Sequence, residues 1–198
     1  MARITTFTHV TLDGVMQAPG RPDEDTRGGF GYGGWEGRYA DEVMAEVAAQ
    51  GMAAESAMLF GRRTYEDFAS FWPNAPQPNP FTEVLNRSQK YVASRTLREP
   101  LGWENSTLLQ GDAGDAVAEL KRSSETDMVV LGSGDLIQTL IRRDLIDEYL
   151  VLIHPLVLGT GRRLFPDGGA PADLRLVDSK VTTTGVIIAT YHRSEAAG

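Results

Sequence analysis

Cysteine is absent from this sequence of 198 residues. Its absence excludes disulfides, thiolate nucleophiles and cysteine-ligated zinc. The three histidines, His9, His154 and His192, lie in or beside apolar segments without the spacing of metal ligands, so we expect no metal site. No segment approaches the roughly 18 consecutive apolar residues of a membrane-spanning helix, and the N-terminus lacks a signal-peptide pattern. We therefore predict a cytoplasmic protein that binds no membrane.

Positive charge is scarce, because 19 lysines and arginines stand against 27 acidic residues and leave a formal net charge of −8. A sequence-independent nucleic-acid binder needs a basic surface to displace counterions from phosphates, so we expect no nucleic-acid partner. Two nucleotide-binding fingerprints are also missing. No G-x-G-x-x-G follows the first predicted strand, and no G-x-x-x-x-G-K-[ST] occurs, so neither the ordinary dinucleotide-binding fold nor a P-loop is supported.

Residues 128–165 are the part of the sequence that we expect to bind the phosphates of a nucleotide. Its first four residues form an apolar run that predicts a buried strand, and a Gly-Ser-Gly turn follows at residues 132–134. An amphipathic helix is predicted from Asp135, and a second strand at residues 149–153. In such a βαβ unit the turn presents backbone N–H groups at a helix N-terminus, a place suited to a phosphate.

Strands and helices alternate along the rest of the chain, which predicts an α/β fold with a mostly parallel sheet and helices on both faces. The length suits one domain, residues 1–198. Strands are predicted at residues 4–10, 57–60, 90–93 and 107–109, helices at residues 41–50 and 115–122, and an antiparallel C-terminal hairpin from residues 175–177 and 186–191 that turns near Gly185.

Helix and loop boundaries follow from individual residues. Gly51 is placed to end the first helix, and Thr64 to cap a helix that stops before Pro73. Residues 72–80 contain four prolines and should form an irregular connection. Residues 15–38 should form a long loop, anchored by the aromatic side chains of Phe30, Tyr32 and Trp35.

Three predicted strands end in similar polar residues, at positions 61–64, 94–96 and 132–134. Ligands of open α/β sheets gather outside the carboxyl ends of the strands, so we expect these segments to converge. Together they offer arginines, hydroxyl groups and two helix N-termini, which suits a dinucleotide with an additional phosphate. The alternative is that the glycines and hydroxyls serve turns and caps. Residues 159–161 form a weak G-x-G that we interpret as a turn.

Among the acidic residues, Asp13 is the candidate proton relay, because it follows the first strand beside the expected cofactor site. A turn residue is the alternative for Asp13. Glu46 lies at the margin of the first helix's apolar stripe and is a candidate for contact with the substrate, as is Trp35 in the long loop. Ser133 lacks the G-x-S-x-G frame of a hydrolase, although a serine hydrolase stays among the alternatives.

Taken in order, these motifs resemble the dihydrofolate reductase-like superfamily. Within it the chain resembles the family typified by the reductase domain of bacterial riboflavin-biosynthesis deaminase-reductases, from Arg3 to about His192. The motifs that carry the resemblance are residues 11–14, 59–66, 92–96, 130–134, 145–148 and 154–159. The resemblance implies a three-layer α/β/α fold with a largely parallel sheet, an NADPH site, a loop at residues 15–38 that closes over nicotinamide and substrate, and frequent homodimers.

The resemblance also implies which residues hold the cofactor. Those expected at the adenosine phosphate are Arg62, Arg63, Thr64, Ser94 and Arg95, together with their neighbours Gly61 and Thr96. Those expected at the pyrophosphate, at the N-terminus of the helix predicted from Asp135, are Gly132, Ser133, Gly134, Asp135 and Leu136.

Two departures bear on the substrate. Folate reductases carry one acid on the first helix, whereas here Asp41, Glu42 and Glu46 compete for that role, and the zinc deaminase half of the riboflavin enzyme is missing. We predict an NADPH-dependent reductase that passes hydride to a small carbonyl or imine, similar to the aminouracil-ribosyl phosphate reductase of riboflavin synthesis. The alternatives are an NADP(H)-binding protein without turnover, a dihydrofolate reductase, and the hydrolase that would use Ser133.

Overall fold

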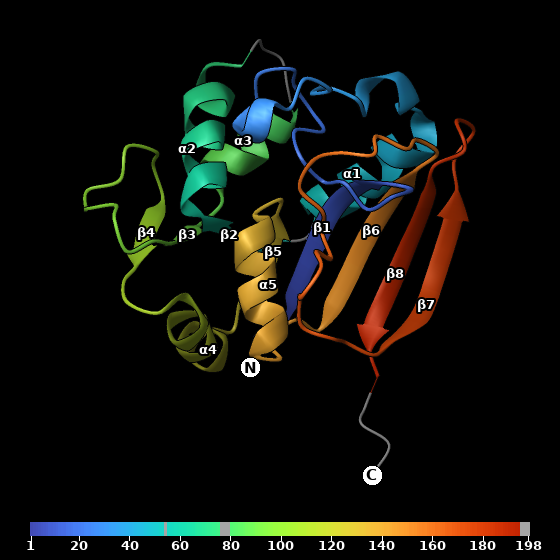
Figure 1. Cartoon of the computed structure of the whole chain (residues 1–198). Helices are drawn as coiled ribbons and strands as arrows, with labels where there is room; N and C mark the ends of the chain where they lie inside the picture. Colours follow the sequence, from blue (N-terminus) through green and yellow to red (C-terminus); the bar gives the residue numbers. More distant parts are fainter. Residues whose placement is uncertain (54, 76–79, 195–198) are drawn as a thin grey trace.

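The computed structural model describes residues 1–53, 55–75 and 80–194. Its centre is an eight-stranded sheet in the order β4-β3-β2-β5-β1-β6-β8-β7 (Figure 1). The strands are β1 (Ile4–Thr11), β2 (Ala57–Gly61), β3 (Lys90–Ala93), β4 (Ser106–Leu109), β5 (Met128–Leu131), β6 (Glu148–His154), β7 (Leu174–Val181) and β8 (Ile187–Arg193).

The predicted mixture of parallel and antiparallel pairing is confirmed. β1 lies in the middle of the sheet and pairs in parallel with β5 on one side and β6 on the other. The pairs β2–β3, β2–β5 and β3–β4 are parallel as well. β8 runs antiparallel to both β6 and β7, and the hairpin between β7 and β8 turns at Gly185 with a φ of +85°. A positive φ favours glycine there because it has no Cβ.

Helices cover both faces of the sheet, so the three-layer α/β/α arrangement is also confirmed (Figure 1). On one face α4 and α5 pack with Ile4, Val130 and Tyr149 into the largest apolar cluster. On the other face α2 and α3 cover β2 and β3, while α1 covers β6 and β8. The helices are α1 (Glu42–Ala53), α2 (Arg62–Phe71), α3 (Pro80–Arg87), α4 (Ala113–Ser123) and α5 (Gly134–Arg142), with short 3-10 turns η1 (Arg27–Gly29), η2 (Gly37–Tyr39) and η3 (Trp72–Asn74).

Three local predictions were wrong. α2 begins at Arg62 directly after β2, so Gly61 is its N-cap residue and Thr64 lies inside the first turn without capping it. α1 continues through Gly51 to Ala53, and Gly51 does not have the positive φ of a helix-ending glycine. The predicted irregular connection at residues 72–80 contains η3 and the first residue of α3, and its residues 76–79 lie outside the described part.

The long loop at residues 15–38 has its own small apolar cluster. Val15, Ala18, Phe30 and Trp35 are buried together against Leu156 and Leu158. Phe30 and Trp35 are therefore anchors as predicted, whereas Tyr32 is 55% exposed and is not. No helix in the described ranges is long and apolar enough to cross a membrane.

Candidate active site

A cavity of about 1040 Å³ opens at the carboxyl end of β5, where Leu131 pairs with Phe7 in the middle of β1. β1 contributes Phe7, Thr8 and His9 to its wall, and α2 contributes the face that includes Arg63 and Thr64. The β5–α5 turn, the long loop and residues 161–167 complete the lining. This is the edge of the sheet at which the sequence places a ligand.

Two of the three polar strand ends meet at this cavity. The N–H of Gly61, at the end of β2, donates to Ser133 Oγ in the β5–α5 turn over 3.0 Å. Ser133 has left-handed backbone angles, φ 58° and ψ 48°, and Gly132 before it has a φ of +57°. A left-handed conformation costs a serine roughly 1–3 kcal/mol, so this hydrogen bond helps to hold a strained turn. Because its oxygen accepts this bond and no histidine in the described ranges contacts it, Ser133 does not have the surroundings of a hydrolase nucleophile.

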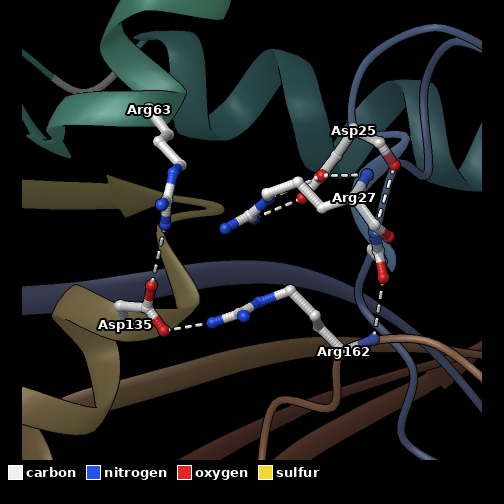
Figure 2. A network of polar contacts seen from close by, with 6 residues as sticks. Asp25, Arg27, Arg63, Asp135 and Arg162 are labelled. Atoms are coloured by element: carbon white, nitrogen blue, oxygen red, sulfur yellow. Dashed lines mark hydrogen bonds and ion pairs between the residues drawn. The ribbon is translucent and has the colours of Figure 1, made fainter. Parts of the chain in front are cut away.

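Three guanidinium groups gather in front of the N-terminus of α5 (Figure 2). Arg63 from α2 lies 3.6 Å from Asp135 Oδ2, and Arg162 binds Asp135 Oδ1. Arg27 from the long loop is held by Asp25, with Nε 2.7 Å from Oδ1. The side chain of Asp135 is 68% exposed, and exposed ion pairs are worth at most about 1 kcal/mol. A phosphate that displaced this carboxylate would therefore lose little.

The same site gains donors from the helix backbones. The first N–H groups of a helix have no partner within it, and the first turns of α2 and α5 both begin at this cavity. The cavity lining includes Arg63, Thr64, Gly132, Ser133, Gly134 and Asp135 among the predicted cofactor residues. This set of cations and N–H groups fits a pyrophosphate.

The other predicted cofactor residues lie outside the cavity. Arg62 points along α2 and pairs with Glu66 at 3.0 Å. Ser94 Oγ accepts the N–H groups of Thr96 and Leu97, at 3.1 and 3.0 Å, so that it closes its own turn, and Arg95 is exposed. The side chain of Leu136 is buried in the core, which leaves only its N–H for a ligand.

Asp13 is held by three donors instead of facing the cavity. Thr11 Oγ1 donates to it over 2.6 Å, and the N–H groups of Leu158 and Gly159 donate over 3.2 and 2.8 Å. Burial raises the pKa of Asp13, but these hydrogen bonds outweigh burial and the net pKa is lowered. The carboxylate therefore joins the end of β1 to the turn after β6, and its role as a proton relay stays a prediction.

The two predicted substrate residues are also placed away from the cavity. The ring of Trp35 is buried, and its Nε1 donates to the carbonyl of Gln17 over 2.9 Å. Glu46 is exposed on α1 and does not line the cavity. Trp35 thus fixes the long loop, and its neighbour Glu36 is one of the acidic residues that line the cavity.

Sequence reasoning treated the histidines only as core or edge residues, and for His154, which is fully buried, that is what the structure shows. It missed that His9 lines the cavity and contacts Glu36 and His154. The signal that it could have used was the position of His9 on the strand that leads to Asp13. Glu36 could not be assigned in this way, because the loop that carries it has no periodicity.

His154 should make the stability of the fold depend on pH. Burial lowers its pKa to about 4, with a further lowering by His9 against the opposing effect of Glu36. An unfolded histidine titrates near 6.5, so the unfolded chain binds the extra proton first as the pH falls. The stabilisation is complete above about pH 6.5 and is lost toward pH 4. We expect the free energy of unfolding to drop by about 2 kcal/mol from pH 7 to pH 5 through this residue.

Urea denaturation of the wild type and His154→Asn at both pH values measures this contribution. The variant should lose most of the drop between pH 7 and pH 5. His192→Asn is the matched control, because His192 lies on β8 outside the cavity, bonded to Glu148 at 2.9 Å. An unchanged pH dependence in His154→Asn would assign the effect to other groups.

Comparison with known proteins places these features in context. Residues 2–188 match the family model described as the RibD C-terminal domain. The uncharacterized protein YyaP of Bacillus subtilis is 31% identical over 139 residues, which are 68% of this chain and 72% of that protein. A second uncharacterized Bacillus subtilis protein, YwjB, is 26% identical over 123 residues, 62% of this chain and 66% of its own length.

Solved structures resemble the whole chain. A putative riboflavin biosynthesis protein from Shewanella sp. PV-4 aligns with a TM-score of 0.72 and 25% identity, over 98% of this chain and 100% of its own. Dihydrofolate reductase from Enterococcus faecalis, complexed with NADP(H) and RAB-propyl, aligns with a TM-score of 0.60 and 14% identity, over 98% and 97%. A pyrimidine reductase-like protein from Corynebacterium diphtheriae aligns with a TM-score of 0.61 and 11% identity, over 98% and 92%. The last two show likeness of fold, which is the dihydrofolate reductase-like fold expected from the sequence.

Proposed function

The chain belongs to the RibD C-terminal domain family, and from this premise we propose that it is an NADPH-dependent reductase of a small carbonyl or imine. Family membership supports a reductase-type reaction. The observation that carries the choice of cofactor is the convergence of Arg27, Arg63 and Arg162 on the N-terminus of α5. Three cations and a helix N-terminus together suit a ligand with several phosphate charges.

In this proposal Arg63 and Thr64 of α2 and residues 132–135 hold the pyrophosphate. NADPH supplies the hydride when it is bound. Arg62, Ser94, Arg95 and Thr96 lie at the neighbouring strand ends, from which they would reach the adenosine phosphate outside the cavity. Leu136 contributes only its N–H.

The long loop would separate the reacting centre from water. Its buried Gln17 accepts the N–H of Arg162 over 3.0 Å, and it donates to the carbonyls of Asp25 and Arg27 over 3.1 and 3.0 Å. One amide therefore ties the two segments that carry Arg27 and Arg162. Exclusion of water strengthens the electrostatic interactions inside a site.

We further propose an aminouracil-ribosyl phosphate as the substrate class, supported by the family and by the similarity to the putative riboflavin biosynthesis protein of Shewanella. We also propose a cytoplasmic location, because this substrate would be a metabolite of the cytoplasm. A homodimer is proposed as well, supported by apolar side chains that β7 and β8 leave exposed, namely those of Leu176, Val181 and Ile187. An exposed apolar patch of this kind often marks an interface.

Titration with NADPH and NADH, followed by nicotinamide fluorescence, tests the proposal. Arg63→Ala should weaken NADPH binding roughly 10- to 100-fold, because a hydrogen bond to a charged group is worth about 1.5–3 kcal/mol. Arg143→Ala is the matched control: this arginine pairs with Asp112 and Asp115 at 3.1 and 2.8 Å, and it does not line the cavity. Failure of the wild type to bind either cofactor below about millimolar would refute the reductase. Equal losses for both cofactors in Arg95→Ala would show that Arg95 does not read the additional phosphate.

A further inference from the structure

Three titratable side chains from different parts of the chain meet at the wall of the cavity. His9 lies on β1, Glu36 in the long loop and His154 at the end of β6. His9 Nδ1 is 2.8 Å from Glu36 Oε2 and 3.1 Å from His154 Nε2. His9 and Glu36 line the cavity, whereas His154 is fully buried behind them.

The surroundings give His154 and Glu36 a defined charge. The rings of Trp35 and Tyr39 pack edge-on against His154, with centroids 5.0 and 5.3 Å away. Burial lowers the pKa of His154 to about 4, so this ring is neutral near pH 7. Burial raises the pKa of Glu36, but the interaction with His9 lowers it by a larger amount. The net pKa is therefore lowered, and Glu36 stays ionised.

These partners fix how His9 presents its ring. Both contacts involve Nδ1, which lies between the carboxylate of Glu36 and the ring of His154. Within residues 1–53, 55–75 and 80–194, no side chain or backbone group hydrogen-bonds to Nε2. Nε2 is therefore the ring nitrogen that these contacts leave without a partner, on a residue that lines the cavity.

We propose that His9 is the catalytic proton donor of this site and that Glu36 is the residue that positions it. The proposal rests on the reductase function proposed above. As hydride adds to the carbonyl or imine carbon, the electron pair of the double bond moves to its oxygen or nitrogen. That atom takes the proton from Nε2 of the His9 imidazolium, and His9 is left neutral. The substrate is reduced, the dihydronicotinamide is oxidised, and His9 regains its proton from water.

Geometry separates His9 from Asp13, the other candidate. The Asp13 carboxylate is occupied by Thr11 and by the N–H groups of Leu158 and Gly159, and it does not line the cavity. A general acid must carry a proton that the substrate can reach. His9 meets this requirement through Nε2, and Glu36 and His154 are the titratable groups in contact with it.

The experiment combines cofactor binding, kinetics and NMR spectra of the histidine rings. NADPH binding to His9→Asn and Glu36→Gln should stay within about threefold of wild type. With the aminouracil-ribosyl phosphate as probe, His9→Asn should lower kcat at least 100-fold and abolish its fall at high pH, in keeping with the 10²–10⁴-fold contribution of general acids. In Glu36→Gln that fall should move to lower pH. His192→Asn, which removes the histidine of another His–Glu pair, should leave kcat unchanged.

NMR spectra of the histidine rings supply a readout that needs no turnover. Glu36→Gln should shift the resonances of the His9 ring, and those of the His192 ring should stay unchanged. The proposal is overturned if His9→Asn keeps the rate and pH profile, if Asp13→Asn rather than His9→Asn removes the alkaline fall, or if the His9 ring resonances are the same with and without Glu36. If the wild type does not bind NADPH, the proposed reductase function is refuted, and the assignment of His9 is refuted together with it.

Discussion

Replacing Gly161 by alanine is expected to destabilise the protein by about 3–5 kcal/mol and to release the long loop. Gly161 has a φ of +112°, and an added Cβ would lie 2.7 Å from the Phe30 ring and 2.7 Å from Val15 Cγ1. Phe30 and Val15 belong to the cluster that anchors residues 15–38. The methyl group would therefore break up the packing that holds Arg27 and Glu36 at the cavity.

Gly159→Ala is the matched control for this substitution. Gly159 also has a positive φ, +71°, but nothing lies within 4 Å of the position of its Cβ. Its replacement should lower the free energy of unfolding by only about 1–2 kcal/mol, the cost of the left-handed conformation for alanine. Urea denaturation gives the two free energies of unfolding, and trypsin cleavage after Arg27 reports release of the loop. Equal destabilisation by both substitutions would show that crowding at Gly161 is not the cause.

Ile137→Ala is expected to lower the free energy of unfolding by about 3–4 kcal/mol. Ile137 is fully buried in the cluster that joins α5 and α4 to the sheet. Removal of its outer atoms leaves a void between a helix and a sheet, which cannot easily close. Because α5 also presents its N-terminus to the cavity, cofactor binding should weaken together with stability.

Two substitutions on the same helix grade this effect. Ile137→Val removes one methylene group and should cost about 0.5–1.5 kcal/mol. Arg142→Ala, at the exposed end of α5, should stay within about 0.5 kcal/mol of wild type. Thermal and urea unfolding measure the series. A loss below 1 kcal/mol in Ile137→Ala would mean that the core relaxes around the missing atoms.

Most of the fold could be predicted because its strands are short apolar runs with clear ends. β3 occupies the predicted residues, Lys90–Ala93, and α5 is the predicted amphipathic helix, which buries Leu136, Ile137, Leu140 and Ile141. Prediction failed where tertiary contacts decide a boundary. α2 needs no side-chain cap at Thr64 because the chain passes directly from β2 into the helix. α3 was missed because only eight residues form it and it begins at a proline.

In the candidate site, too, some contacts could be predicted from the sequence and others could not. Gly61, Ser133 and Gly132 could be brought together from the sequence, because parallel neighbouring strands end at one edge. The partners of Asp13 could not, since Leu158 and Gly159 lie 145 and 146 positions further along the chain. Contacts made by irregular segments, such as that of Glu36 with His9, leave no periodic pattern. The contacts of Asp13 and of His9 are what distinguish the role of a turn residue from that of a proton donor, and neither set could be read from the sequence.

The central position of β1 has a consequence for the order in which the molecule is assembled during synthesis. β1 leaves the ribosome first, yet its neighbours are residues 128–131 and 148–154, and Ile4 and Thr11 pair with Met128 and His154. β2, β3 and β4 can pair before those residues exist. Until those residues are made, the nascent chain thus holds a half-sheet with an open edge and an unpaired first strand, the kind of species that aggregates or engages chaperones.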